Sequence, residues 1–294
     1  MGGSGTSCDI IQQLINNKGS IPASTLRNER MPSYINKKSL VIITSFSGNT
    51  IESISMMKNA LACNAEVISV SSGGTLETES KINNCKHIKI PKISLSRSAF
   101  PYLLIPCLNI INDFLTPRRE NIDTISQETK NIFDSISIDV PLDQNISKRI
   151  ANFVLDGFPI CYSSVDLFPA ATRFKASLNE NSKIHCIRES ILEASHNEIV
   201  PLTYNVYQLV PKLILLRWNN DGLIANERFE KVHKFLNSIF HNVLEIKISN
   251  KSLLQSIINA IYILDMATIY AAFHRNLDPE PTPAIEILKN SQLQ

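Results

Sequence analysis

The chain has 294 residues, which is long for a single hydrophobic core, so we expect two domains of about 100 to 150 residues each. Its 29 Lys and Arg residues against 27 Asp and Glu residues give a formal charge of +2, which excludes a broad basic surface. We therefore expect no nucleic-acid partner and no membrane partner, and any anion must be bound locally.

Residues 1–117 are predicted to form the first α/β domain. From residue 38 onward, short β-branched runs alternate with segments of helical periodicity. Continuous apolar strands of this kind are usually covered by helices on both faces, which favours a largely parallel sheet. The predicted strands are residues 40–44, 66–70 and 87–90, and the predicted helices are residues 50–62 and 100–115.

Residues 118–150 are predicted to form a helical connector, because the sequence there becomes polar and charged. Residues 151–294 then repeat the alternation of strands and helices, which predicts a second α/β domain with C-terminal helices. We expect its long apolar helix, residues 252–274, to pack across the second sheet. The other predicted elements are the strands 158–162, 183–187, 212–216 and 243–248 and the helices 169–178 and 227–240.

Targeting to a membrane or to secretion is not expected. Residues 2–7 have neither a basic nor an apolar segment, which favours the cytoplasm. The two most apolar stretches, residues 100–115 and 253–273, are interrupted by Asn, Gln and Asp, so we expect buried helices. The six cysteines form no CxxC pair and no metal-ligand spacing with histidine, which predicts reduced thiols.

Residues 2–7, Gly-Gly-Ser-Gly-Thr-Ser, lead into a helix with an apolar face. Glycines let a phosphate or a sugar hydroxyl approach the N–H groups at a helix N-terminus, where partial positive charge favours an anion. A flexible terminus has the same composition, so both interpretations stay open here. Because such a loop normally follows a buried strand, we expect that the first strand of this domain is missing from the sequence.

Residues 45–50, Ser-Phe-Ser-Gly-Asn-Thr, lie where the predicted strand 40–44 leads into the next helix. Three hydroxyls and the amides at the carboxyl end of a parallel strand can bind a phosphomonoester without a lysine. The alternative is an ordinary helix cap by Asn49 or Thr50. Because a cap accounts for one hydroxyl and not for three, the pattern favours a phosphate site.

A family resemblance extends this interpretation. Residues 45–52, Ser-Phe-Ser-Gly-Asn-Thr-Ile-Glu, and residues 71–76, Ser-Ser-Gly-Gly-Thr-Leu, resemble the signature of sugar isomerase (SIS) domains. Further segments resemble one branch of these proteins, the archaeal-type bifunctional phosphoglucose/phosphomannose isomerases, in the same order along the chain: residues 2–4, 96–99, 179–183, 193–198 and 281–289.

The resemblance implies a fold, an assembly and a set of site residues. The implied fold is two SIS-type three-layer αβα domains with mainly parallel sheets, and the implied assembly is a homodimer with shared active sites. By position, Arg97 matches the arginine that stabilises the enediolate, Glu180 the carboxylate that shuttles the proton, and Thr282 the threonine linked with accepting the mannose epimer. The implied phosphate and sugar contacts are Gly3, Ser4, Ser45, Ser47 and Thr50, and the implied ring-opening pair is His196 and Lys289.

The chemistry of aldose–ketose exchange suits these residue types. A base must move a proton from C2 to C1 through a cis-enediol, and a carboxylate such as Glu180 can do so in a water-poor site without a metal. An imidazole, with a reference pKa of about 6.5, suits the preceding ring opening, which favours His196. Arg97 would place positive charge beside the enediolate. We therefore predict a cytoplasmic isomerase of glucose 6-phosphate and mannose 6-phosphate that uses no metal and no cofactor.

Two alternatives belong to other functional classes. A regulatory SIS protein would keep the phosphate pocket without the catalytic groups. The joint presence of four such groups argues against it: Glu180, His196, Arg97 and Lys289. Synthesis or deamination of glucosamine 6-phosphate is also SIS chemistry. We disfavour this chemistry because the 294 residues include no N-terminal-cysteine amidotransferase domain that could supply ammonia.

Overall fold

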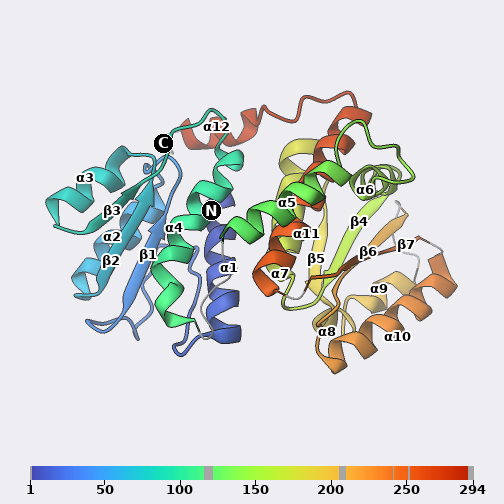
Figure 1. Cartoon of the computed structure of the whole chain (residues 1–294), viewed down its shortest axis with the longest axis horizontal. Helices are drawn as coiled ribbons and strands as arrows, with labels where there is room; N and C mark the ends of the chain where they lie inside the picture. Colours follow the sequence, from blue (N-terminus) through green and yellow to red (C-terminus); the bar gives the residue numbers. More distant parts are fainter. Residues whose placement is uncertain (1, 116–121, 205–209, 241, 251, 291–294) are drawn as a thin grey trace. The chain divides into compact units, whose positions relative to one another are not determined.

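The computed structural model describes residues 2–115, 122–204, 210–240, 242–250 and 252–290 (Figure 1). The chain divides into two compact units, residues 1–119 and 120–294. The helices of the segment 118–150, expected to be a connector, are counted in the second unit. Each unit is a mixed α/β structure whose sheet is parallel throughout its described strands.

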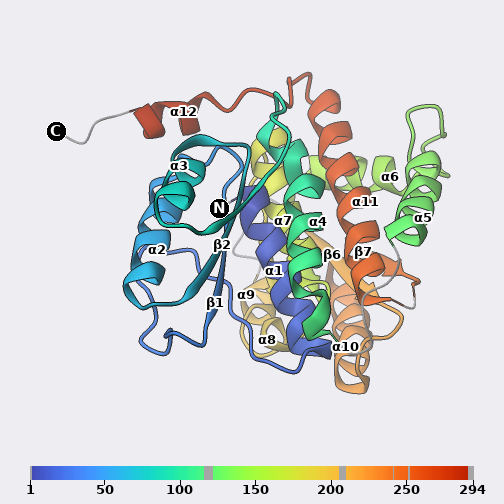
Figure 2. The same ribbon diagram turned by 60° about the vertical axis from the view of Figure 1, so that its left-hand side comes forward.

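The first unit consists of the elements α1 (Gly2–Lys18), β1 (Leu40–Thr44), α2 (Ile51–Ala62), β2 (Glu66–Ser71), α3 (Gly74–Ile82), β3 (Lys86–Lys89), the 3₁₀ turn η1 (Ser96–Ala99), α4 (Phe100–Ile111) and the 3₁₀ turn η2 (Asn112–Phe114). Its sheet has the order β1-β2-β3. Helices α2 and α3 cover one face of this sheet, and α1 and α4 cover the other (Figure 2). Each of the three strands lies within one residue of its predicted ends.

The glycine-rich start of the chain is helical, which corrects the loop expected there. Residues 2–7 form the first turns of α1. The hydroxyl of Thr6 donates to the carbonyl oxygen of Gly2, and the hydroxyl of Ser7 donates to that of Gly3. These bonds run back one helical turn, so both hydroxyls find partners within the helix and leave its backbone pattern intact.

The second unit consists of α5 (Ile122–Ser135), α6 (Ile146–Leu155), β4 (Phe158–Ser163), α7 (Phe168–Ser177), the π-helical turn η3 (Leu178–Ser182), β5 (Ile187–Ser190), α8 (Ile191–Ala194), α9 (Ile199–Thr203), β6 (Pro211–Trp218), α10 (Leu223–Phe240), β7 (Val243–Ile248), α11 (Leu253–His274) and α12 (Pro283–Asn290). Its parallel sheet has the order β5-β4-β6-β7. Helices α7 and α11 lie on one face, and α8 and α10 lie on the other (Figure 1).

Helix α11 is the central helix of the second unit. It was expected to pack across the second sheet; it packs on α5, α6 and α7 and contacts the sheet at β7. In the described part of the chain, α11 is the one helix long and apolar enough to cross a membrane, and 72% of its most apolar window is buried inside the unit. Its buried Gln255 donates to the side-chain oxygen of Asn259 at 2.7 Å. Burial with internal pairing is typical of a core helix.

The strand predicted at residues 183–187 lies later in the chain, at Ile187–Ser190. Pairing with β4 begins where Ile187 lies opposite Ile160. Lys183 has a φ of 55°, a left-handed conformation that ends the π-helical turn and cannot belong to a strand. The polar and apolar alternation of residues 183–187 therefore belongs to a connection that approaches the sheet.

Candidate active site

The loop 45–50 connects β1 to α2 and carries the three hydroxyls of the predicted phosphate site. Ser45 is buried, and its Oγ lies 2.9 Å from Oγ1 of Thr50, so one of these hydroxyls donates to the other. Ser47 is exposed, and its Oγ accepts a 3.2 Å hydrogen bond from the backbone N–H of Asn49. With its oxygen engaged as an acceptor, the Ser47 hydroxyl can direct its proton to an anion.

Neither Asn49 nor Thr50, the two candidates for an ordinary helix cap, caps the N-terminus of α2 with its side chain. Thr50 occupies the N-cap position, but its side chain makes no capping hydrogen bond and pairs with Ser45 instead. Asn49 directs its side-chain oxygen to Thr75, outside α2. The first N–H groups of α2 therefore present partial positive charge that a phosphate can neutralise.

Two glycines bring a second loop, residues 71–76, against the first. Gly48 has a φ of +71°, and a Cβ on it would lie 1.8 Å from the carbonyl oxygen of Gly73. Gly74 also has a φ of +71°, and a Cβ on it would lie 2.5 Å from the carbonyl oxygen of Ser47. Because both positions combine a left-handed backbone with such close neighbours, only glycine fits at either.

The start of α1 also contacts the loop 45–50. The Ser4 Oγ accepts a 3.3 Å hydrogen bond from the N–H of Phe46, and the Thr44 hydroxyl donates to the Ser4 carbonyl oxygen at 3.1 Å. These bonds place Gly3 and Ser4 beside the hydroxyls of the loop. The turn η1, which carries the half-buried Arg97, packs on α1.

Glu180 lies in the π-helical turn η3, which continues α7 into the connection to β5. Such turns are rare and occur often at functional sites. Neighbouring side chains fix this one to α11. The Nδ2 of Asn181 donates to Oγ1 of Thr268 at 2.8 Å, and the hydroxyl of Ser182 donates to the Thr268 carbonyl oxygen at 2.6 Å. Glu180 is half-buried on this anchored turn.

Lys183 joins the turn of Glu180 to the segment that precedes α12. Its ammonium donates to the carbonyl oxygen of Glu180 at 2.6 Å. It also donates to the carbonyl oxygens of Asp278 at 3.3 Å and Pro281 at 3.1 Å. Thr282 follows Pro281 directly. One ammonium therefore holds together the two segments that carry Glu180 and Thr282, a contact that no local sequence pattern indicates.

His196 lies in the exposed turn between α8 and α9, beyond the carboxyl end of β5. Its backbone N–H donates to the carbonyl oxygen of Glu193 at 2.9 Å. Glu180 precedes β5 and His196 follows it, so the four strand residues Ile187–Ser190, roughly 13 Å long, lie between them in the chain.

Glu198 is an acidic residue near His196 to which the sequence analysis gave no role. Burial raises the pKa of its carboxyl, the neighbouring Glu189 on β5 raises it further, and the Tyr162 hydroxyl lowers it. The one sequence feature that could have indicated a role for Glu198 is its position at the end of the segment 193–198, which carries the family resemblance. Glu198 and Glu189 therefore interact near the carboxyl end of β5.

Lys289 lies in the last turns of α12, and its side chain is outside the described residues. All six cysteines are free thiols, and Cys107, Cys161 and Cys186 are buried. Within the described ranges, no group of three or more His, Cys, Asp or Glu side chains gathers as a metal ion would require.

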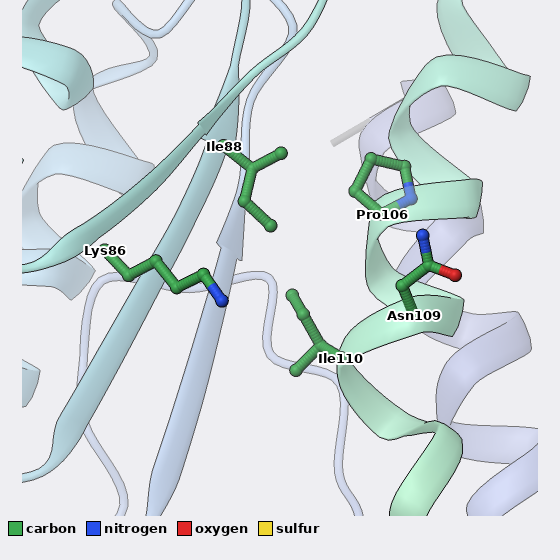
Figure 3. Close-up of a pocket in the computed structure, with 5 residues that line it drawn as sticks. All are labelled: Lys86, Ile88, Pro106, Asn109 and Ile110. Carbon is green, nitrogen blue, oxygen red and sulfur yellow. The ribbon is translucent and has the colours of Figure 1, made fainter.

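A pocket of about 220 Å³ lies between β3 and α4 in the first unit (Figure 3). Its lining is mostly apolar, and its one charged residue is Lys86 at the start of β3. None of the predicted site residues contributes to it. We therefore assign no part of the proposed chemistry to this pocket.

The family of the bacterial phospho-glucose isomerase C-terminal SIS domain matches residues 143–291, more than half of the chain. The chain belongs to this family. The match includes the SIS-domain residues Glu180, His196, Thr282 and Lys289, which the sequence analysis placed in the site.

Two bifunctional phosphoglucose/phosphomannose isomerases are similar over nearly the whole chain, which confirms the resemblance to that branch. The one from Caldicellulosiruptor bescii is 28% identical over 99% of this chain and 87% of its own length. The one from Thermoplasma acidophilum is 29% identical over 98% of this chain and 86% of its own length. The solved tagatose-6-phosphate ketose/aldose isomerase of Escherichia coli has a TM-score of 0.70 and 13% identity, and the match covers 95% of this chain and 81% of that one. This likeness confirms the SIS-type α/β fold.

Proposed function

We propose that this SIS-family chain is an aldose–ketose isomerase that interconverts glucose 6-phosphate and mannose 6-phosphate with fructose 6-phosphate through a cis-enediol. The observation that carries the proposal is the loop 45–50, where three hydroxyls meet an uncapped helix N-terminus. The similarity to bifunctional isomerases over nearly the whole chain supports the choice of hexose 6-phosphates. The enzyme acts in the cytoplasm.

The phosphate binds at the first turn of α2. Ser45, Ser47 and Thr50 donate their hydroxyl protons, and the N–H groups of α2 contribute partial positive charge. Each hydrogen bond to a charged group contributes about 1.5–3 kcal/mol, so three hydroxyls suffice for a site without a lysine. Gly3 and Ser4, held beside this loop by the Phe46 N–H, contact the sugar.

Glu180 is the base that carries the proton between C1 and C2. Its support is the anchored turn η3, because a catalytic carboxylate needs a defined position and a partly water-excluded surrounding. Arg97 stabilises the charge that develops on the enediolate oxygen. Thr282, which Lys183 ties to the Glu180 turn, accepts the mannose epimer at C2.

His196 and Lys289 open the sugar ring before isomerisation by shifting a proton between O1 and O5. Glu180 lies before the amino end of β5, whereas His196 lies beyond its carboxyl end. This placement at opposite ends of a strand supports a homodimer in which His196 serves the site of the other subunit.

The test of the proposed function is a coupled assay that starts from fructose 6-phosphate and measures glucose 6-phosphate and mannose 6-phosphate in the presence of EDTA. We expect both products, because the proposed base is a carboxylate and needs no metal. Loss of activity on adding EDTA contradicts the metal-free mechanism. Absence of both products contradicts the isomerase and favours a regulatory sugar-phosphate-binding SIS protein.

A further inference from the structure

A residue from the loop 45–50 caps the helix that follows the next strand. Gly73 occupies the N-cap position of α3 and has no side chain with which to cap it. The Oδ1 of Asn49 takes this role: it accepts the backbone N–H of Thr75 at 2.9 Å and the Thr75 hydroxyl at 3.1 Å. One orphan N–H of α3 is thereby satisfied from a different loop.

Backbone bonds complete the junction between the two loops. The N–H of Leu76 donates to the carbonyl oxygen of Gly48 at 2.9 Å, and the N–H of Ser72 donates to that of Phe46 at 2.9 Å. A Cβ on Gly74 would lie 2.6 Å from Oδ1 of Asn49, so the helix start sits directly on this carboxamide. The side chain of Asn49 therefore lies at the contact between the two loops.

The position of Asn49 within its own loop links this junction to the phosphate hydroxyls. Its backbone N–H donates to Oγ of Ser47, and Thr50 is the next residue. Oδ1 of Asn49 holds the start of α3, and the backbone N–H of the same residue holds Ser47, so the contact with Thr75 restrains the stretch of loop that carries both hydroxyls. The two hydroxyls on either side of Asn49 therefore depend on a contact made 26 positions away.

We propose that Asn49 is a positioning residue for the phosphate loop, and that its cap on α3 holds Ser47 and Thr50 in the arrangement that binds phosphate. This inference rests on the proposed function. The phosphate contacts are the same in bound substrate and transition state, so loosening the loop weakens both equally. Removal of the cap therefore raises KM and leaves kcat nearly unchanged.

The test compares Asn49→Ala, Thr75→Val and their double variant with the wild type in steady-state kinetics on fructose 6-phosphate. Loss of a helix cap destabilises the helix start by an energy that corresponds to about a five- to tenfold change in affinity. We therefore expect KM to rise roughly five- to tenfold in Asn49→Ala, while kcat stays within about twofold of the wild type. Thr75→Val removes the hydroxyl bond and keeps the backbone N–H bond, so its effect should be smaller than that of Asn49→Ala. The double variant resembles Asn49→Ala, which already removes both bonds. Thr75→Ser keeps both hydrogen bonds and serves as the matched control, with a wild-type KM.

Asn49→Asp separates the cap from the charge. Its oxygen still caps α3, so the melting temperature stays at the wild-type value, while the added charge beside Ser47 repels the phosphate dianion and raises KM more than Asn49→Ala does. A wild-type KM in Asn49→Ala, or a fall in kcat without a rise in KM, overturns the inference.

Binding of inorganic phosphate to the full chain, followed by thermal shift, separates this inference from the proposed function. If the wild type binds phosphate but isomerises nothing, the proposed function fails. The inference then stands or falls on whether Asn49→Ala binds phosphate more weakly than Thr75→Ser. A wild type that neither binds phosphate nor isomerises overturns both.

Discussion

Within the loop 45–50, some residues shape the backbone and others offer their hydroxyls to the substrate. Gly48 belongs to the first group, because any side chain there would meet the carbonyl oxygen of Gly73. Ser45 and Thr50 belong to the second, and their hydroxyls already form one pair. Binding an anion would redirect two protons that are close together and need little rearrangement.

We expect Ser45→Ala combined with Thr50→Ala to raise KM for fructose 6-phosphate far more than it lowers kcat. The lost hydrogen bonds are shared by the bound substrate and the transition state, so their loss weakens binding of both. Steady-state kinetics measure the two constants. Thr78→Ala, which removes an exposed hydroxyl of α3, is the control and leaves both constants unchanged. Equal falls in kcat and kcat/KM in the double variant would contradict the assignment.

The candidate site was predictable where it lies in one stretch of sequence. The hydroxyls at 45, 47 and 50 follow a recognisable strand, so their place at the edge of a parallel sheet could be expected. The contact of Asn49 with Thr75 and that of Lys183 with Pro281 could not. Each joins segments distant in the sequence, and no local periodicity reports which distant groups meet.

At the scale of elements, the turn that carries Glu180 depends on how α7 meets α11. Arg173 on α7 contacts Asp265 on α11 at 2.7 Å, and the Ser177 hydroxyl donates to the same carboxylate at 2.8 Å. The Arg173 side chain is only 10% exposed and that of Asp265 is 24% exposed. Because both charged groups are largely shielded from water, removing one of them leaves the other without compensation and destabilises the fold.

We expect Asp265→Ala to lower the free energy of unfolding of the second unit by about 3 kcal/mol, because it leaves the nearly buried Arg173 charge without this carboxylate. Urea unfolding followed by fluorescence of Trp218, the one tryptophan in the chain, measures the change. The matched control is Glu227→Ala, which breaks an exposed pair with Lys231 and should change stability by less than about 0.5 kcal/mol. Equal effects of the two substitutions would refute the role of this ion pair.

A second element-scale feature is a hydrogen-bonded chain under α3. The Ser80 hydroxyl donates to the carbonyl oxygen of Leu76 at 2.6 Å, so its oxygen accepts the proton of Ser69, 2.7 Å away. The Ser69 oxygen then accepts from Nδ1 of His87 at 2.7 Å. This assigns the ring proton to Nδ1, and the lone pair of the buried Nε2 has no partner among the residues that the structure describes.

We expect the first unit to lose stability as the pH falls below about 6.5, the pKa of histidine in an unfolded chain. Burial lowers the pKa of His87 in the folded state; Glu77 opposes this, and Lys81 and Lys89 add to it. Between these two pKa values the unfolded chain binds a proton at His87 and the folded chain does not. The free energy of unfolding therefore falls as the pH drops from about 6.5 to the pKa of His87 in the folded state. Hydrogen exchange of residues 66–71 and 86–89 between pH 7.5 and 5.5 measures it.

The control for this pH effect is His87→Asn, because the amide N–H can replace the Nδ1–H donor to Ser69 without titrating. Its exchange, corrected for the intrinsic rate, should depend less on pH than that of the wild type. The same pH dependence in both proteins would show that another group is responsible.

Strands and long helices were predicted well because their signal is local. The apolar run at β1, Leu-Val-Ile-Ile-Thr, is continuous, and such runs are typical of strands in parallel sheets. The strand at residues 183–187 was wrong because the backbone of Lys183 is left-handed, while its ammonium donates to four carbonyl oxygens. The helical start of α1 was missed because glycines and hydroxyls are weak helix formers and are held there by tertiary packing.

At the scale of the whole molecule, the proposed dimer makes a specific prediction about complementation. Mixing Glu180→Gln with His196→Ala chains under subunit exchange places both lesions in one site of each mixed dimer and none in the other. With half of the dimers mixed and half of their sites intact, activity should return to roughly a quarter of the wild-type value. The coupled assay before and after exchange measures it. If both residues served the site of one chain, every site would keep a lesion and the mixture would remain inactive.

The measurement that tests the central claim most directly is exchange of solvent deuterium into C1 and C2 of the hexose 6-phosphates, followed by NMR in the wild type and in Glu180→Gln. A cis-enediol intermediate formed by a carboxylate base predicts deuterium at these carbons with the wild type. In Glu180→Gln, the label should be absent while phosphate affinity stays within a few-fold, because the loop 45–50 is unchanged. Deuterium exchange retained in Glu180→Gln would show that another residue is the base, and wild-type turnover without any label at C1 or C2 would contradict an enediol that exchanges its proton with water.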